Sequence, residues 1–177
     1  MTRRTTPDRT FQQYAALIDR ALGCIASERL AFVHPRPLEA GPIYPLLLNR
    51  NQPVALRGDE RLQFVAGQHL RFAYGSDLAT DTFRIELVNY WYVLSDATGR
   101  EVLAFHWTPE ADPKVMRTTP HLHVGSVNIA KDAPLAPKTF NKLHLPTGFV
   151  SIVAVVRFLI EELRCNPGIR SGRRFSK

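Results

Sequence analysis

Hydrophobic residues recur with two different periods along this 177-residue chain. Over residues 10–28 they recur every three or four positions, which is typical of one face of a helix. The apolar positions are Phe11, Tyr14, Leu17, Ile18, Leu22 and Ile25, preceded by Thr10 as the cap. Residues 152–164 show the same period, with Ser151 as the cap and Ile152, Val155, Val156, Leu159 and Leu163 as the buried stripe. The pattern predicts a helix near each end of the chain.

Between the two helices, short apolar runs alternate with turn residues. Residues 34–53 contain five prolines, which fix φ and predict an irregular connection. Strands are expected at 54–56, 62–65, 69–74, 83–94, 101–107 and 121–129, separated by Gly-containing turns. Asp96 to Gly99 is typical of a hairpin loop.

The longest expected strand, 83–94, has two different faces. Alternation places Phe83, Ile85, Leu87, Trp91 and Val93 on one face, and Arg84, Glu86, Tyr90 and Tyr92 on the other. Together these elements predict an α+β fold, in which a twisted antiparallel sheet is packed by an N-terminal and a C-terminal helix. The length fits a single domain, 1–177, with basic arms at 1–9 and 166–177.

The chain carries a net charge of +7 with a pI of about 9.8, and much of the excess lies at its ends. Such arms suit a phosphate backbone, although they also serve as solvated tails. Cys24 and Cys165 are far apart and are expected to be reduced thiols. No secretory signal and no membrane-spanning run is evident, so we expect a cytoplasmic protein with no membrane partner.

Four of the six histidines lie in the C-terminal half, at His106, His121, His123 and His144. On a strand, His121 and His123 share a face. His106 shares a face with Val102 and Ala104 and can join the pair if its hairpin lies beside their strand. His144 is expected to brace the turn before the last helix. Each histidine can also be a structural residue bonded to a backbone carbonyl.

One chemical possibility is a metal site. His121 and His123 are ~7 Å apart along a strand, and His106 can supply a third ligand for a divalent ion such as zinc. No Asp or Glu lies between Asp112 and Asp132 to complete the site. Gly125 stands where a third alternating histidine would fall, which argues against the histidine-triad nucleotide hydrolases.

A second possibility is acid–base cleavage of RNA, which needs no cofactor. The reaction requires a base, an acid and a cation near the phosphate. His106, His121 and His123 are the candidate catalytic residues. The candidate substrate-binding residues are Arg84, Arg117 and Lys142 for the phosphate, and Tyr90, Tyr92 and Trp107 for stacking on a base.

The C-terminal half also resembles a known layout. A long aromatic strand (90–94) is followed by Asp96…Gly99, a strand ending in Phe105-His106, the element Pro120-His121-Leu122-His123, and a final helix ending Phe158-Leu-Ile-Glu-Glu-Leu. This layout, over residues 83–164, resembles the TumE-type toxins of bacterial toxin–antitoxin pairs. In that family a strand ending in Arg-Tyr-Asp-Asn precedes the His-x-His element. Here Phe105-His106-Trp107-Thr108 takes that place, and only His121-x-His123 corresponds residue for residue.

The resemblance implies ribonuclease-like activity and an antitoxin partner. The leading interpretation of the sequence is therefore a basic toxin component that acts on RNA. Two alternatives stay open: a non-enzymatic module that binds nucleic acid or protein through its basic termini, and a small metalloprotein with histidine ligands.

Overall fold

The computed structural model describes residues 6–32, 37–75, 83–109, 118–125 and 144–165. Its two helices are α1 (Pro7–Leu22) and α3 (Ile152–Glu161). The strands are β1 (Leu30–Ala31), β2 (Ile43–Leu48), β3 (Val54–Leu56), β4 (Asp59–Tyr74), β5 (Phe83–Asp96), β6 (Glu101–Trp107), β7 (His121–Val124) and β8 (His144–Pro146). A short 3-10 turn, η1 (Asn49–Asn51), follows β2. The expected α+β fold is confirmed.

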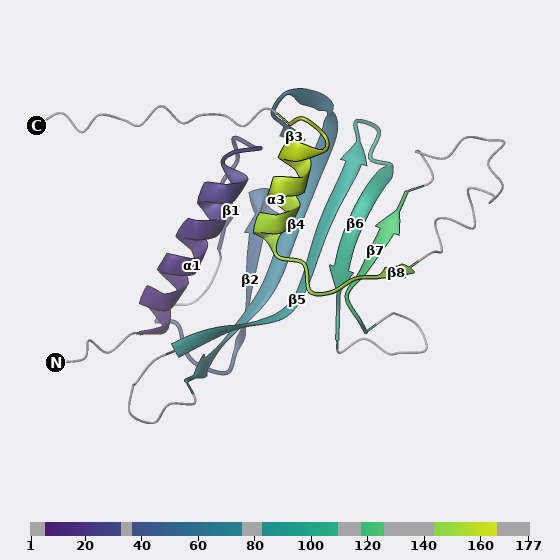
Figure 1. Cartoon of the computed structure of the whole chain (residues 1–177). Coiled ribbons are helices and arrows are strands. Elements are labelled where there is room, and N and C mark those ends of the chain that lie inside the picture. The colour runs from purple at the N-terminus through teal and green to yellow at the C-terminus, as the bar shows by residue number, and fades with distance from the viewer. Residues whose placement is uncertain (1–5, 33–36, 76–82, 110–117, 126–143, 166–177) are drawn as a thin grey trace, which may run out of the picture.

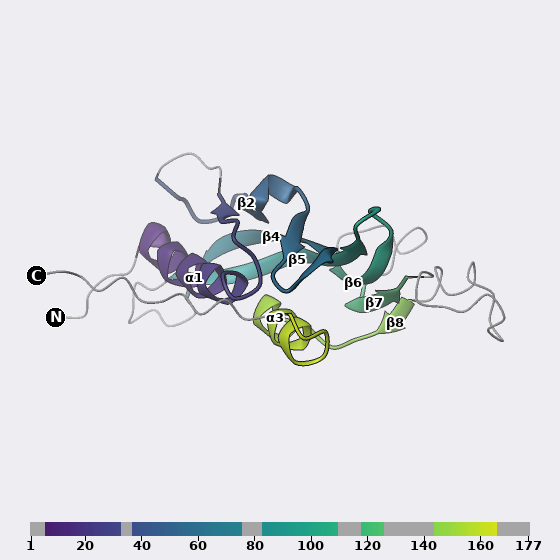
Figure 2. The same cartoon turned by 90° about the horizontal axis from the view of Figure 1, so that it is seen from above.

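All strand pairs are antiparallel, and the sheet order is β1-β2-β4-β5-β6-β7-β8 with β3 beside β4. The two helices lie side by side against the middle of the sheet, while β7 and β8 extend beyond α3 at one edge (Figure 1). Figure 2 shows the same arrangement from above, with α3 on one side of the strands. Neither of these two helices has the length and apolar character needed to cross a bilayer.

Helix α1 begins and ends earlier than its apolar period predicts. The Thr6 side chain accepts a hydrogen bond from the Arg9 amide at 3.3 Å, and Pro7 occupies the first helical position, where its missing N–H costs nothing. The helix ends at Leu22 because Gly23 forms its C-cap. Residues 7–9, expected in a basic arm, are therefore helical. The rest of the expected arms, 1–5 and 166–177, lies outside the described residues.

Two strand predictions need correction. The proline-rich connection contains a regular strand, β2, in which Pro45 pairs with His69 of β4. Within the described part of the chain, β1 pairs only with Leu47 and Leu48 of β2, so no described strand needs an N–H from Pro45 on that side. In β4, Gly67 was expected in a turn but lies within one continuous strand of 16 residues.

A bulge in β5 changes which side chains face the helices. His69 pairs with Asn89 and Leu70 with Leu87, so Val88 is an extra residue on β5. The alternation therefore shifts by one position at Val88. The prediction that Tyr90 and Tyr92 share a face with Arg84 and Glu86 is wrong for this reason.

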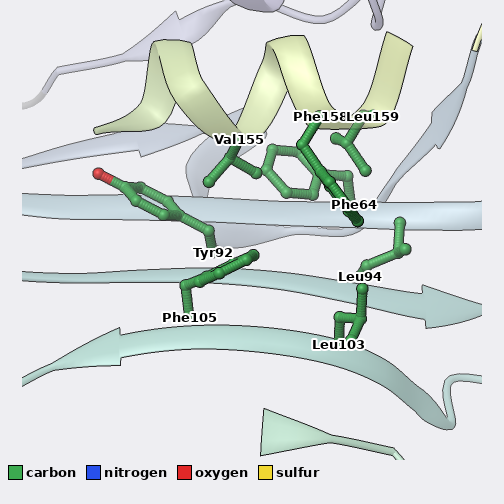
Figure 3. A pocket seen from close by; sticks show the side chains of 8 residues that line it. All are labelled: Phe64, Tyr92, Leu94, Leu103, Phe105, Val155, Phe158 and Leu159. Carbon is green, nitrogen blue, oxygen red and sulfur yellow. The ribbon is translucent and has the colours of Figure 1, made fainter. Parts of the chain in front are cut away.

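Below, the sheet face under the helices is called the helix face, and the opposite one the outer face. On the helix face the large core residues meet beneath α3, where Figure 3 shows their side chains pointing toward one another. They are Phe64, Tyr92, Leu94, Leu103, Phe105, Val155, Phe158 and Leu159. Each such side chain stabilises the fold by roughly 1.5–3 kcal/mol when fully buried. Cys24 and Cys165 are both free thiols, as expected.

Candidate metal centre on the outer face

The register of three neighbouring strands brings four histidines together. His106 on β6 pairs with His121 on β7, and His123 pairs with Ala104 on one side and His144 of β8 on the other. Directly paired residues of an antiparallel sheet point to the same face. Because Phe105 on β6 faces the helices, its neighbour His106 and the other three histidines lie on the outer face.

The imidazole rings are in mutual contact. The ring centroids of His121 and His123 are 5.0 Å apart, and those of His106 and His123 are 4.9 Å apart. His106, His121 and His123 each offer one ring nitrogen, and these nitrogens lie within 4.8 Å of one another. Ligand nitrogens on one tetrahedral zinc, with bonds of ~2.0–2.1 Å, are separated by ~3.3 Å. Small ring movements would therefore bring the three nitrogens onto a common ion.

Hydrogen bonding leaves lone pairs available in this group. The His121 Nδ1 lies 2.7 Å from the Thr119 carbonyl oxygen, which can only accept, so Nδ1 carries the proton and Nε2 keeps its lone pair. The Nε2 atoms of His106 and His123 are buried and have no hydrogen-bond partner among the described residues. Buried polar atoms without partners are rare in native proteins, and an absent ion is one explanation for them.

Burial keeps two of these rings, His106 and His123, neutral. Burial, and to a lesser extent the neighbouring imidazoles, lowers the pKa of His123 to about 4 and lowers the pKa of His106 in the same way. Neutral imidazole is the form that binds a metal. Because they are neutral, His106 and His123 are poor proton donors near pH 7, which weakens the expected role of either one as a general acid.

One carboxylate lies beside the histidines. The Oε1 atom of Glu101, the first residue of β6, lies 3.8 Å from Nδ1 of His123. Burial raises the pKa of Glu101. Sequence spacing does not reveal this neighbour, because Glu101 is distant from residues 121–123 in sequence and comes close only through β6–β7 pairing.

His144 belongs to the same cluster, contrary to its expected role as a brace for the following turn. Its ring centroid is 4.3 Å from that of His123 and 4.8 Å from that of His121. It is not one of the three residues whose nitrogens converge. Its place beside them follows from the pairing of β8 with β7, which sequence spacing alone does not reveal.

The expected substrate-binding residues do not gather around the histidines. Tyr90 and Tyr92 are each 1% exposed on the helix face, so neither ring can stack on a base. Trp107 contacts Tyr90 and Phe149 and also faces away from the cluster.

Of the expected phosphate-binding cations, Arg84 also lies away from the histidines. Arg84 pairs with Glu86 near the start of β5, and His106 is opposite Trp91, seven residues further along that strand. Because Val88 is an extra residue, this separation is six strand steps on β4, or ~20 Å at ~3.3 Å per residue. Arg117 and Lys142 lie outside the described residues.

Trp91 is an outer-face residue that the sequence pattern placed on one face with Ile85 and Leu87, which lie on the helix face. Its Nε1 donates to the Asn51 side chain at 2.9 Å, and its ring lies over Gly67, where a Cβ would be only 2.1 Å from the ring. Asn51 ends η1, in which Asn49, Arg50 and Asn51 all have positive φ. Consecutive left-handed residues are strained, and such strain tends to occur near functional sites. Trp91 is thus held in place next to the His106 position.

Comparisons of this chain with protein-family models, with curated proteins and with solved structures found no match.

Proposed function

We propose that the protein is a small metalloprotein whose divalent ion is held by His106, His121 and His123. The observation that supports the proposal most directly is the convergence of three ring nitrogens within 4.8 Å of one another. The proton on His121 Nδ1 and the unpartnered Nε2 atoms of His106 and His123 are consistent with three neutral ligands. Imidazole ligands suit zinc, copper, nickel or iron(II) in preference to magnesium or calcium.

Three neutral ligands and an open fourth position are typical of catalytic, not structural, zinc sites. The ion would retain its full double charge and would supply Lewis acidity and an activated water, which is the chemistry of hydrolysis. Around it, the Thr119 carbonyl would fix the tautomer of His121, and His144 would lie beside the ligands. We therefore assign the centre to metal-assisted hydrolysis.

The test is metal content. Protein produced without a histidine tag, stripped with a chelator and titrated with Zn²⁺ or Co²⁺, is expected to bind one ion per chain. His121→Ala and His123→Ala should lose that ion while keeping the wild-type circular dichroism spectrum. His69→Ala is the matched control, because His69 contacts Trp91 and not the cluster. A wild-type protein that binds no ion, or an equal loss in His69→Ala, contradicts the proposal.

Cleavage of RNA by metal-free acid–base chemistry, with an antitoxin as partner, is the competing proposal. The basic net charge supports it. The placement of Arg84, Tyr90 and Tyr92 away from the histidines, and the low pKa of His123, give it less support. RNA cleavage that persists in excess chelator and disappears in His121→Ala would favour it over the metal centre.

A further inference from the structure

A second feature lies on the helix face, across the sheet from the histidines. A cavity of about 390 Å³ opens between α1 and α3 above β5. Its walls include Leu17 and Ile18 of α1, Ile85 and Leu87 of β5, and Val153 of α3. This volume falls within the range of ~300–1,000 Å³ that small-molecule sites occupy.

A chain of hydrogen bonds forms the polar part of the cavity. The Tyr14 hydroxyl donates to Oε1 of Gln68 at 2.9 Å, and Nε2 of Gln68 donates to the Tyr92 hydroxyl at 2.7 Å. Gln68 is only 4% exposed, yet it lines the cavity together with Tyr14. After these bonds the Gln68 amide keeps one N–H donor and one carbonyl lone pair, and the Tyr14 oxygen can still accept. They can therefore hold a polar group of a ligand without rearranging.

The mouth of the cavity is apolar and open to solvent. Leu17, Phe149 and Val153 line it and are 52%, 57% and 42% exposed. Large apolar side chains grouped around an opening are a signature of ligand or partner sites. None of the described residues that line the cavity is Asp, Glu, Lys, Arg or His. An ionic group would lose its hydration there without gaining a counter-charge.

We propose that this cavity binds a small amphiphile with an apolar body and one uncharged hydrogen-bonding head, such as an alcohol, amide or ester. The apolar body would lie against Leu17, Leu87 and Val153, and the head would bond to Tyr14 and Gln68. The site is separate from the histidine cluster and does not depend on metal binding.

The experiment compares three probes at neutral pH that have a hydrocarbon tail of the same length and differ in the head group: 1-octanol, octanoate and octylammonium. Amide chemical shifts in two-dimensional NMR report the location and the affinity. We expect saturable binding of octanol, with shifts confined to α1, the start of α3 and the neighbouring part of β5. Octanoate and octylammonium should bind at least ten-fold more weakly.

A blocking variant tests the location. Val153→Trp places a large ring at the mouth from an exposed position and should weaken octanol binding at least ten-fold. Ile43→Trp is the matched control, because Ile43 is 44% exposed on β2 and does not line the cavity. Non-saturable binding, equal affinity for a charged head, or equal loss in both variants would overturn the proposal. Thermal unfolding of each variant verifies that it is folded.

Discussion

Acidification is expected to destabilise this protein through His123. Its pKa is about 4 in the folded chain against a usual 6.5, because burial and the neighbouring imidazoles oppose its protonation. Between these two pKa values the unfolded chain binds the proton more tightly than the folded chain does. The contribution of His123 to stability is therefore fully present above the unfolded pKa and is lost as the pH falls toward the folded pKa. Between about pH 7.5 and about pH 4.5, this difference removes about 2.5 kcal/mol from the free energy of unfolding.

The assay is urea unfolding followed by far-ultraviolet circular dichroism across this pH range, with a chelator present to remove bound metal. Asparagine occupies similar space to the proximal part of histidine and does not titrate, so His123→Asn should lose about 2.5 kcal/mol of the pH dependence. Ile43→Asn, at an exposed position of β2 that carries no titratable group, serves as the control and should retain the wild-type slope. If His123→Asn and wild type show the same slope, protonation of His123 is not opposed by the fold.

Two further substitutions probe the histidine cluster from its surroundings. Gly125→Ala should destabilise the fold by ~1–3 kcal/mol in urea unfolding, because its Cβ would lie 1.7 Å from the Glu101 backbone oxygen. Gly148→Ala is the control and should be nearly neutral, because no atom lies within 4 Å of its Cβ. Equal effects of the two substitutions would contradict the packing argument. Glu101→Gln should weaken Zn²⁺ binding about ten-fold in a competition titration if the carboxylate orients His123, whereas Glu86→Gln should leave it unchanged. Unchanged affinity in Glu101→Gln would remove that residue from the site.

Strict alternation explains what could be predicted about the site. The strand 101–107 has the expected bounds, and within it His106 faces opposite to Phe105, as period two requires. His121 and His123 share a face for the same reason. These are local properties, and a side chain's face follows from its neighbours in sequence.

The features that the sequence pattern did not predict depend on how each strand pairs with its neighbours. The bulge at Val88 has no sequence signature, yet it exchanges the faces of every residue that follows, including Tyr90 and Trp91. His144 and Glu101 join the cluster only because β8 and β6 lie on either side of β7. Such placements depend on strand order and register, which one sequence does not specify.

The bulge at Val88 also determines which kinds of mutation β5 tolerates. A point substitution there alters one side chain and leaves the rest of the strand in phase. Deletion of Val88 would remove the bulge and leave Ile85, Leu87, Tyr90 and Tyr92 in one unbroken alternation, all still facing the helices. The strand is therefore expected to tolerate the loss of this residue as well as its substitution, so related chains can differ by one residue in the spacing between these two pairs.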